Sequence, residues 1–145
     1  MVRMRGDRLE LTGPCGPAAW YVESHDDDDP MEVVKRLSTN LMGPPLLVHS
    51  TSWRRGPGGV ILSFVVVVGE KQATELESAP IGRAELARNS ATDAATGIGA
   101  SQVVEHGLRH VAWLVQDDDA VKAALSPAWL HVLAGYLPEP FRHLG

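Results

Sequence analysis

The chain has very little cysteine. The one cysteine among its 145 residues, Cys15, cannot form a disulfide within the chain, and the spacing of a cysteine-based zinc site is missing. Cys15 lies in the run Gly13 to Pro17, whose glycines and prolines predict a turn. We interpret it as a loop thiol, because a reactive thiolate needs an electropositive neighbour.

Long apolar runs and basic clusters are also scarce. The longest apolar stretch, 60–68, is interrupted by Ser63 and reaches about half of the roughly 20 residues that a membrane helix needs. No apolar signal region follows the N-terminal arginines. Lys and Arg number 13 against 18 Asp and Glu, for a formal charge of −5. We therefore expect a cytoplasmic protein with no membrane and no nucleic-acid partner.

The overall composition is that of a globular domain. Hydrophobic residues make up 44% of the chain and charged residues 21%. The length suits one core, which predicts a single α+β domain over 1–145. Arginine far outnumbers lysine, as expected from the codons of a high-GC bacterium.

Alternating apolar residues predict two β-hairpins. Residues 8–12 and 18–24 form the first pair around the Gly/Pro turn, and residues 46–53 and 59–68 form the second. The second pair encloses a tight-reversal sequence, Arg-Arg-Gly-Pro-Gly. The near-continuous apolarity of 59–68 predicts a central strand covered on both faces. The fold class is therefore α+β, with an antiparallel sheet of about four strands.

A symmetric turn would fix the register of the second hairpin. Ser50 would then face Ser63, and Trp53 would face Val60. One side of the pair would carry the bulky residues of the core, namely Leu47, His49, Thr51, Trp53, Val60, Leu62, Phe64 and Val66.

Residues 30–42 carry the signals of a helix that crosses the sheet. Asp29 can cap it, Pro30 suits its first position, and Glu32 can bond back to the cap. We interpret the aspartates of 26–29 as part of this helix start, because the glycine spacing of a calcium loop is missing. The expected apolar stripe is Met31, Val34, Leu37 and Leu41.

The C-terminal part predicts a helical layer. Helices are expected from Ser101, over 120–125 and over 128–137, with Phe141 and Leu144 folding back onto the domain. Residues 70–100 are weakly patterned apart from a short helical signal at 83–88. A functional lid, a flexible loop and misread elements all remain open for this segment.

His106 and His110 have the i, i+4 spacing that places two imidazoles on one helix face, as a zinc site requires. Gly107 stands where the metalloprotease signature has its catalytic glutamate. A third ligand would have to come from His49, His25 or His131. The alternative is a solvated or interface face, on which Glu105 and Arg109 form an ordinary pair.

Trp113 lies on the arc opposite the apolar stripe of its helix. Something must shield the indole from water, and three interpretations stay open: coverage by the chain itself, a homodimer contact, or a ligand pocket. The expected contact patch consists of Trp113, Arg109, His106 and His110.

Motifs of nucleophilic or cofactor chemistry are missing from the sequence. There is no G-x-S-x-G elbow, no phosphate-binding loop and no G-x-G-x-x-G. His49 and Ser50 are adjacent on a strand, so their side chains diverge, and His49 is best interpreted as a core histidine. We expect no catalytic residue and no cofactor.

Two pairs of stretches carry a resemblance. "LLVHSTSWRR" with "VILSFVVVV", and "VVEHGLRHVAWLVQDD" with "YLPEPFRHL", resemble uncharacterised small proteins of high-GC Gram-positive bacteria, which implies no activity. The strands also resemble the opening strands of Nudix hydrolases. The magnesium-binding R-E-x-x-E-E cluster does not follow, and Glu70, Glu75, Glu77 and Glu85 have other spacings.

We therefore expect a non-enzymatic interaction or regulatory domain that self-associates as a homodimer through the helix carrying Trp113. One alternative is a metal-dependent or Nudix-like hydrolase of small molecules with His106 and His110 as ligands. Another is a catalytically inactive domain that binds a small molecule under a lid formed by 70–100.

Overall fold

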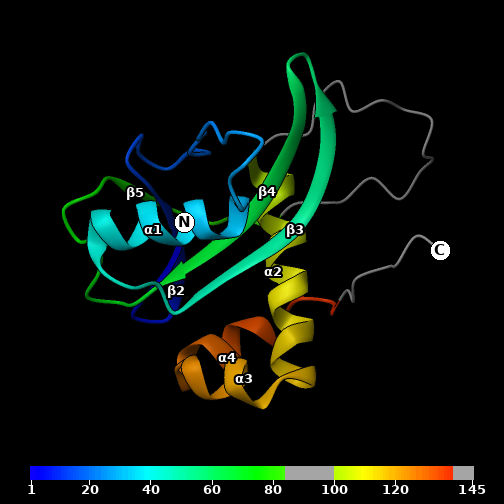
Figure 1. The fold of residues 1–145 in the computed structure, drawn as a ribbon. Helices are drawn as coiled ribbons and strands as arrows, with labels where there is room; N and C mark the ends of the chain where they lie inside the picture. Colours follow the sequence, from blue (N-terminus) through cyan, green and yellow to red (C-terminus); the bar gives the residue numbers. More distant parts are fainter. Residues whose placement is uncertain (84–99, 139–145) are drawn as a thin grey trace.

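The computed structural model describes residues 1–83 and 100–138, which combine a five-stranded mixed sheet with four helices (Figure 1). The sheet has the order β3-β4-β1-β2-β5. The strands are β1 (Val2–Arg5), β2 (Arg8–Thr12), β3 (Leu47–Gly56), β4 (Gly59–Val68) and β5 (Ser78–Pro80). The helices are α1 (Pro30–Met42), α2 (Ala100–Asp117), α3 (Asp119–Ala124) and α4 (Pro127–Leu133). The α+β class is confirmed, whereas the sheet is mixed and has one strand more than expected.

The N-terminal hairpin differs from the predicted one. β2 pairs with β1 across a tight turn at Gly6, whose φ of 63° suits glycine, and not with residues 18–24. Residues 18–24 form no strand, so that part of the prediction was wrong. β1 is a four-residue strand with two arginines, too short and too charged to stand out by alternation, and yet Val2 and Met4 are buried.

Strand β4 lies between β3 and β1 in the sheet, so the predicted central, fully covered strand is found only at its C-terminal end. It pairs with β3 along its whole length and in parallel with β1 at Val67 and Val68 only. The last four residues of β4 are all buried, because α1 and α2 lie on opposite sides of the sheet (Figure 1).

The β3–β4 hairpin is confirmed, but its register is not. Trp53 pairs with Leu62, Ser52 pairs with Ser63, and an irregularity between Ser50 and Ser52 inserts a residue into β3. The strands continue to Gly56 and Gly59, so the turn is shorter than a symmetric five-residue loop.

This bulge divides the side chains that the sequence had placed together on the core side. His49 points toward α2, with its ring centroid 5.7 Å from that of His110. Three side chains lie beyond the core: Trp53 is 62% exposed, Val60 is 61% exposed and Leu62 is 41% exposed. The hairpin tip therefore extends as an arm from the body of the molecule (Figure 1).

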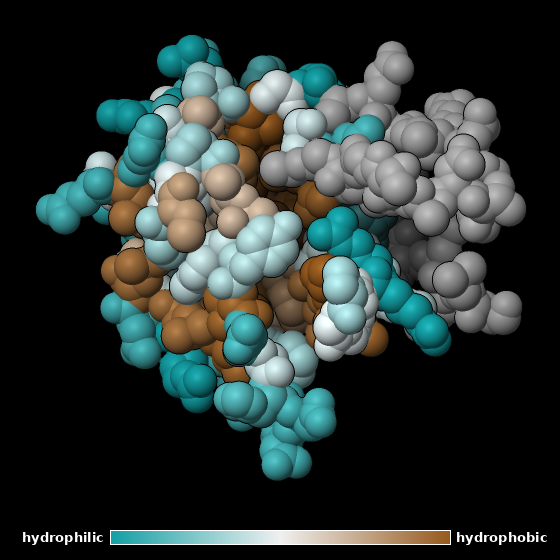
Figure 2. Space-filling model, turned by 90° about the horizontal axis from the view of Figure 1, so that it is seen from above, coloured by the Kyte–Doolittle hydropathy of each residue, from teal (hydrophilic) through white to brown (hydrophobic). Residues whose placement is uncertain are grey.

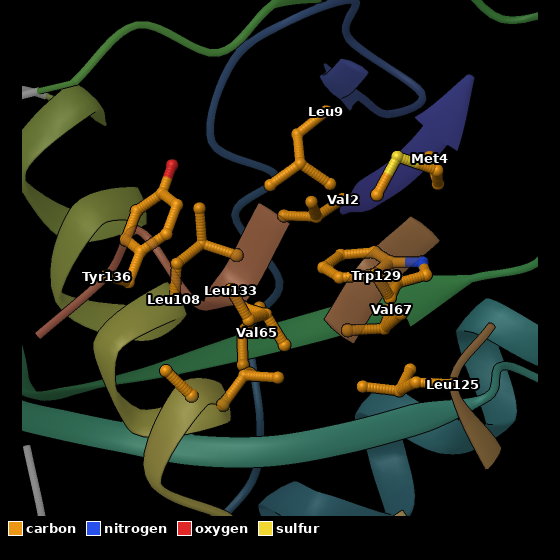
Figure 3. Close-up of a cluster of buried hydrophobic side chains, with 12 residues drawn as sticks. Val2, Met4, Leu9, Val65, Val67, Leu108, Leu125, Trp129, Leu133 and Tyr136 are labelled. Atoms are coloured by element: carbon orange, nitrogen blue, oxygen red, sulfur yellow. The ribbon is translucent and has the colours of Figure 1, made fainter. Parts of the chain in front are cut away.

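The main core lies between the sheet and helices α2, α3 and α4 (Figure 3). Leu108 from α2, Val67 from β4 and Trp129 from α4 are almost completely buried in it. Gly107 faces the sheet, and a Cβ at this position would make an ordinary van der Waals contact with the Val65 Cβ at 3.4 Å. The buried members are Val2, Met4, Leu9, Val65, Val67, Leu108, Val111, Ala112, Leu125, Trp129, Leu133 and Tyr136.

Helix α1 has the predicted bounds and the predicted cap, since the Asp29 carboxylate accepts a hydrogen bond from the Met31 amide at 2.9 Å. Glu32 was expected to bond back to the cap, but its carboxylate instead pairs with Lys35 at 3.4 Å. The expected apolar stripe is only partly buried, and the fully buried positions are Val33 and Ser38. One side of α1 is thus left to line a hollow.

The C-terminal helices follow the predicted order, although α4 ends at Leu133 instead of Leu137. Strand β5 lies inside the segment 70–100 that had no clear pattern. The helical signal at 83–88 falls almost wholly outside the described residues, as do Phe141 and Leu144. None of the described helices combines the length and apolarity needed to cross a membrane.

Candidate functional site: a cleft beside strand β4

A hollow of about 870 Å³ lies beside residues 60–66 of β4. Its walls are the segment 18–28, helix α1, the β3–β4 arm and the first turns of α2. In the view from above, apolar side chains show between the hydrophilic groups at this end of the molecule (Figure 2). The volume is within the range of about 300–1,000 Å³ that small-molecule sites usually occupy.

The inner part of the cleft is apolar. Helix α1 contributes the side chains of Val33, Val34 and Leu37, which are partly or fully buried. Strand β4 contributes Leu62 and Phe64 from the face that is turned toward α1. An occupant with apolar groups would therefore be shielded from water on at least two sides.

The rim carries charges of mainly one sign. Glu23, Asp26 and Asp28 line the cleft from the segment that precedes α1, and Arg54 lines it from β3. His25 stands in the same segment, where its backbone amide lies 3.4 Å from the Asp28 carboxylate. The rim therefore favours a cationic group near residues 23–28.

The outer wall of the cleft is a segment with strand-like residues but no strand pairing. Residues 18–24 read Ala-Ala-Trp-Tyr-Val-Glu-Ser, and Tyr21 is 73% exposed. Trp20 is half-buried. The sequence indicated an extended conformation here, but the segment finds no sheet edge among the described residues. No signal in the sequence placed it opposite β4.

Three histidines come together on the other side of the arm, between β3 and α2. The His106 and His110 rings lie 4.5 Å apart between centroids, and His49 lies 5.7 Å from His110. The His106 Nε2 atom is 3.3 Å from the Thr51 carbonyl oxygen. Burial lowers the pKa of His49 below its ordinary value.

His49, one of the three residues suggested as a third metal ligand, therefore lies near His110. His25 lines the cleft, and His131 lies exposed on α4. Within residues 1–83 and 100–138, no three His, Cys, Asp or Glu side chains converge so that they could hold a metal ion.

Glu105 was expected on a solvated or interface face of its helix, and it is instead buried within the chain, with 1% of it exposed. The expected i, i+4 pair with Arg109 is present, with a distance of 3.4 Å between its Nε and the carboxylate. Arg83 adds two further donors, its Nε at 3.1 Å and its Nη2 at 3.0 Å. The sequence could not show that an arginine far along the chain neutralises Glu105 and permits its burial.

Arg83 also ties the segment after β5 to the C-terminal layer. Its Nη1 donates to the Gly135 carbonyl at 2.7 Å, and its guanidinium lies 4.0 Å from the centre of the Tyr136 ring. The Glu105 carboxylate raises the pKa of Arg83, and burial raises the pKa of Tyr136. These contacts hold the structure together away from the cleft.

The four residues of the expected contact patch do not form one exposed surface. His110 is 4% exposed, Arg109 is engaged by Glu105, and both His106 and Trp113 are half-buried. The helical pattern misplaced His110 because α2 is buried over a wider arc than its apolar stripe indicates.

The sequence also did not predict a buried ion pair, which Arg3 and Glu10 form on the α1 side of the sheet. Arg3 is 2% exposed and donates to the Glu10 carboxylate at 2.9 Å and to the Ala73 carbonyl at 2.7 Å. Glu10 also accepts from Ser78 at 2.9 Å, and the Arg3 hydrogen bond lowers the pKa of Glu10. This pair attaches the turns before β5 to the sheet.

Comparison of the chain with protein-family models, with curated proteins and with solved structures finds no match. The function must therefore be inferred from the site alone.

Proposed function

We propose that this protein is a non-catalytic binding domain and that the cleft beside β4 holds an elongated, largely apolar ligand. The observation that carries the proposal is the 870 Å³ hollow, with apolar side chains from α1 and β4 and a rim of carboxylates. A hollow of this kind leaves apolar surface in contact with water, and a ligand that covers it gains free energy from burial.

The hydrolase alternative has weaker support. The histidines suggested as ligands sit mainly in packed surroundings, where His110 is 4% exposed. Glu70, one of the scattered glutamates, accepts a hydrogen bond from the Gly6 amide at 3.2 Å, and Glu85 lies outside the described residues.

Binding of the neutral dye Nile red, followed by its fluorescence, tests the proposal. Leu62→Asp places a charge in the cleft, whereas Leu41→Asp changes a leucine of α1 that does not line it. The two leucines are a matched pair, because each is 41% exposed. We expect Leu62→Asp to weaken dye binding about tenfold, since losing the burial of a leucine costs about 1.5 kcal/mol.

Leu41→Asp should bind the dye like the unchanged protein. Equal dye binding by both variants would place the dye outside the cleft and refute the proposal.

A second candidate function is self-association, which we propose to occur through the arm and not through the helix carrying Trp113. Trp53 is 62% exposed and Val60 is 61% exposed, and both lie on the arm. Large exposed apolar side chains of this kind are typical of contact surfaces between proteins.

A further inference from the structure

We propose that the ligand of the cleft is an extended peptide segment that adds as a further strand to the edge of β4 that faces away from β3, and that it carries a Lys or Arg near one end. This inference rests on the proposed binding function of the cleft and names the chemistry of its ligand.

The edge of β4 that faces away from β3 is paired over only a short distance. β1 joins it at Val67 and Val68, where Val2 and Arg3 are the partners. Upstream of these residues, β4 continues for the whole length of the arm with β3 as its partner on the other edge. Within residues 1–83 and 100–138, no strand covers the remaining edge.

The direction of the peptide groups along this edge follows from two contacts. The Val67 carbonyl accepts from the Leu46 amide at 2.8 Å, and the Ser63 carbonyl accepts from the Thr51 hydroxyl at 3.2 Å. Both donors lie on the β3 side. Because peptide groups of successive residues point to opposite edges of a strand, those of Val60, Leu62 and Phe64 point away from β3. They offer N–H and C=O groups at regular spacing along the cleft.

An extended peptide matches these groups better than a compact molecule does. Val60, Leu62 and Phe64 all line the cleft, so a strand that pairs with them would lie inside it. Main-chain hydrogen bonds would then supply affinity, and alternate side chains would contact Val34 and Leu37 of α1. The paired stretch would span about five residues, or roughly 17 Å at the rise of a strand.

The negative charge of the rim favours a basic residue at one end of the peptide. Glu23, Asp26 and Asp28 line the cleft, and the whole chain carries a formal charge of −5. A Lys or Arg that flanks the paired stretch would lie near these carboxylates and gain electrostatic energy. A second copy of this chain would bring the same negative charge, so the charges favour a basic peptide over a homodimer in the cleft.

Fluorescence anisotropy with the full chain tests this inference. The probe is a fluorescein-labelled peptide with about eight residues of alternating valine and threonine followed by lysines. Two modified probes carry N-methyl groups, one on the valines and the other on the threonines. A strand pairs with its neighbour through alternate residues only.

We expect the unmodified probe to bind and one N-methylated probe to bind at least about tenfold more weakly, because a few hydrogen bonds of about 1 kcal/mol each are lost. The other N-methylated probe should keep its affinity. Equal binding by all three probes, or no binding of the unmodified probe, would overturn the inference.

Two changes in the protein provide an independent test. Leu62→Pro removes an N–H that points into the cleft and is not needed by β3, while Leu62→Ala keeps it. We expect the proline variant to bind the probe more weakly than the alanine variant, with circular dichroism confirming that both are folded. Equal affinities of two folded variants would overturn strand addition.

The second change tests the proposed contact between the rim carboxylates and a basic side chain of the peptide. Glu23→Lys should weaken binding of the lysine-containing probe. Replacing the lysines of the probe by glutamates should restore binding to this variant. Loss of binding without this restoration would contradict the charge assignment.

Amide hydrogen exchange in the unliganded protein decides whether the edge is free. We expect fast exchange at Leu62 and Phe64, and slowing when the probe is added. Slow exchange without the probe would show that this chain or a second copy already covers the edge, and would overturn the inference. Nile red binding that depends on Leu62 would leave the cleft function standing in that case.

Discussion

At the scale of single residues, two buried carboxylates are each neutralised by an arginine. Arg3 and Glu10 are joined at 2.9 Å on one side of the sheet, and Arg83 joins Glu105 at 3.0 Å on the other. Each pair joins segments that are distant in the sequence or on different strands. It therefore holds a loop in place and also neutralises a buried charge.

The Arg3–Glu10 pair predicts a pH dependence of stability. The pKa of Glu10 is lowered in the folded protein, first by the Arg3 hydrogen bond, so the unfolded state takes up a proton more readily. The contribution of Glu10 is therefore fully present above the ordinary pKa of a glutamate and is lost as the pH falls through the lower, folded value.

We expect Glu10→Gln to lower the free energy of unfolding at neutral pH, and the difference from the unchanged protein to shrink below about pH 4.5. Urea titrations at a series of pH values measure this difference. Glu32→Gln is the control, because its pair with Lys35 is largely exposed and contributes little. A difference that stays constant in acid would contradict the role assigned to Glu10.

Residue patterns could not predict these pairs. Arg3 and Glu10 become neighbours only through the β1–β2 register, and nothing in the four residues of β1 marked it as a strand. Glu105 could be paired with Arg109 from its spacing, but the contribution of Arg83 depends on the tertiary fold.

At the scale of elements, the helix starts differ in how they are capped. Asp118 caps α3 by accepting hydrogen bonds from the amides of Ala120 at 2.8 Å and Val121 at 3.3 Å. Ser126 stands at the same position of α4, but its side chain makes no capping bond. The two N-cap residues therefore allow a capping side chain to be compared with a non-capping one in the same protein.

We expect Asp118→Ala to destabilise the protein by about 1 kcal/mol and Ser126→Ala to have a much smaller effect. Thermal or urea unfolding of the two variants measures the difference. Equal losses would show that the carboxylate of Asp118 does not stabilise α3 through its cap.

Elements with strong local signals were predicted well. The capping residues gave α1 its bounds, and the apolar runs around a Gly/Pro turn gave the β3–β4 hairpin. The bulge near Thr51 changed the register, because a single inserted residue moves later side chains to the other face. Residues 18–24 were mistaken for a strand, since β propensity does not show whether a sheet edge is available.

At the scale of the whole molecule, the arm extends away from the other described elements (Figure 1). It exposes Trp53 and Val60 while the base of the same hairpin is buried. The arm also forms one wall of the cleft, so that association and ligand binding would compete for Leu62.

We expect light scattering to show a mass that rises with concentration from 15.6 kDa toward twice this value. Trp53→Ser should weaken this association by roughly thirtyfold, in line with about 2 kcal/mol for a tryptophan at a contact. Trp113→Phe should have little effect. A mass that stays at the monomer value at every concentration would refute self-association.

The cleft could not be predicted from the sequence. Its walls come from four separate stretches of chain, and each stretch by itself has an ordinary structural explanation. The aspartates before α1 read as a helix start, which the Asp29 cap confirms, and their place on a rim follows only from the path of residues 18–28. The sequence suggested a ligand-binding domain as one alternative, but it did not indicate where the binding site lies.

The way in which β1 joins the sheet has a mechanical consequence. Nine residue pairs hold the β3–β4 plate together and four hold β1 to β2, but only two connect these plates to each other. A load that pulls the plates apart is therefore shared by Val67, Val68 and their two neighbours, and the helices bridging the joint carry the rest. We therefore expect a sheet under load to separate first between β4 and β1, along the line that ends at the cleft.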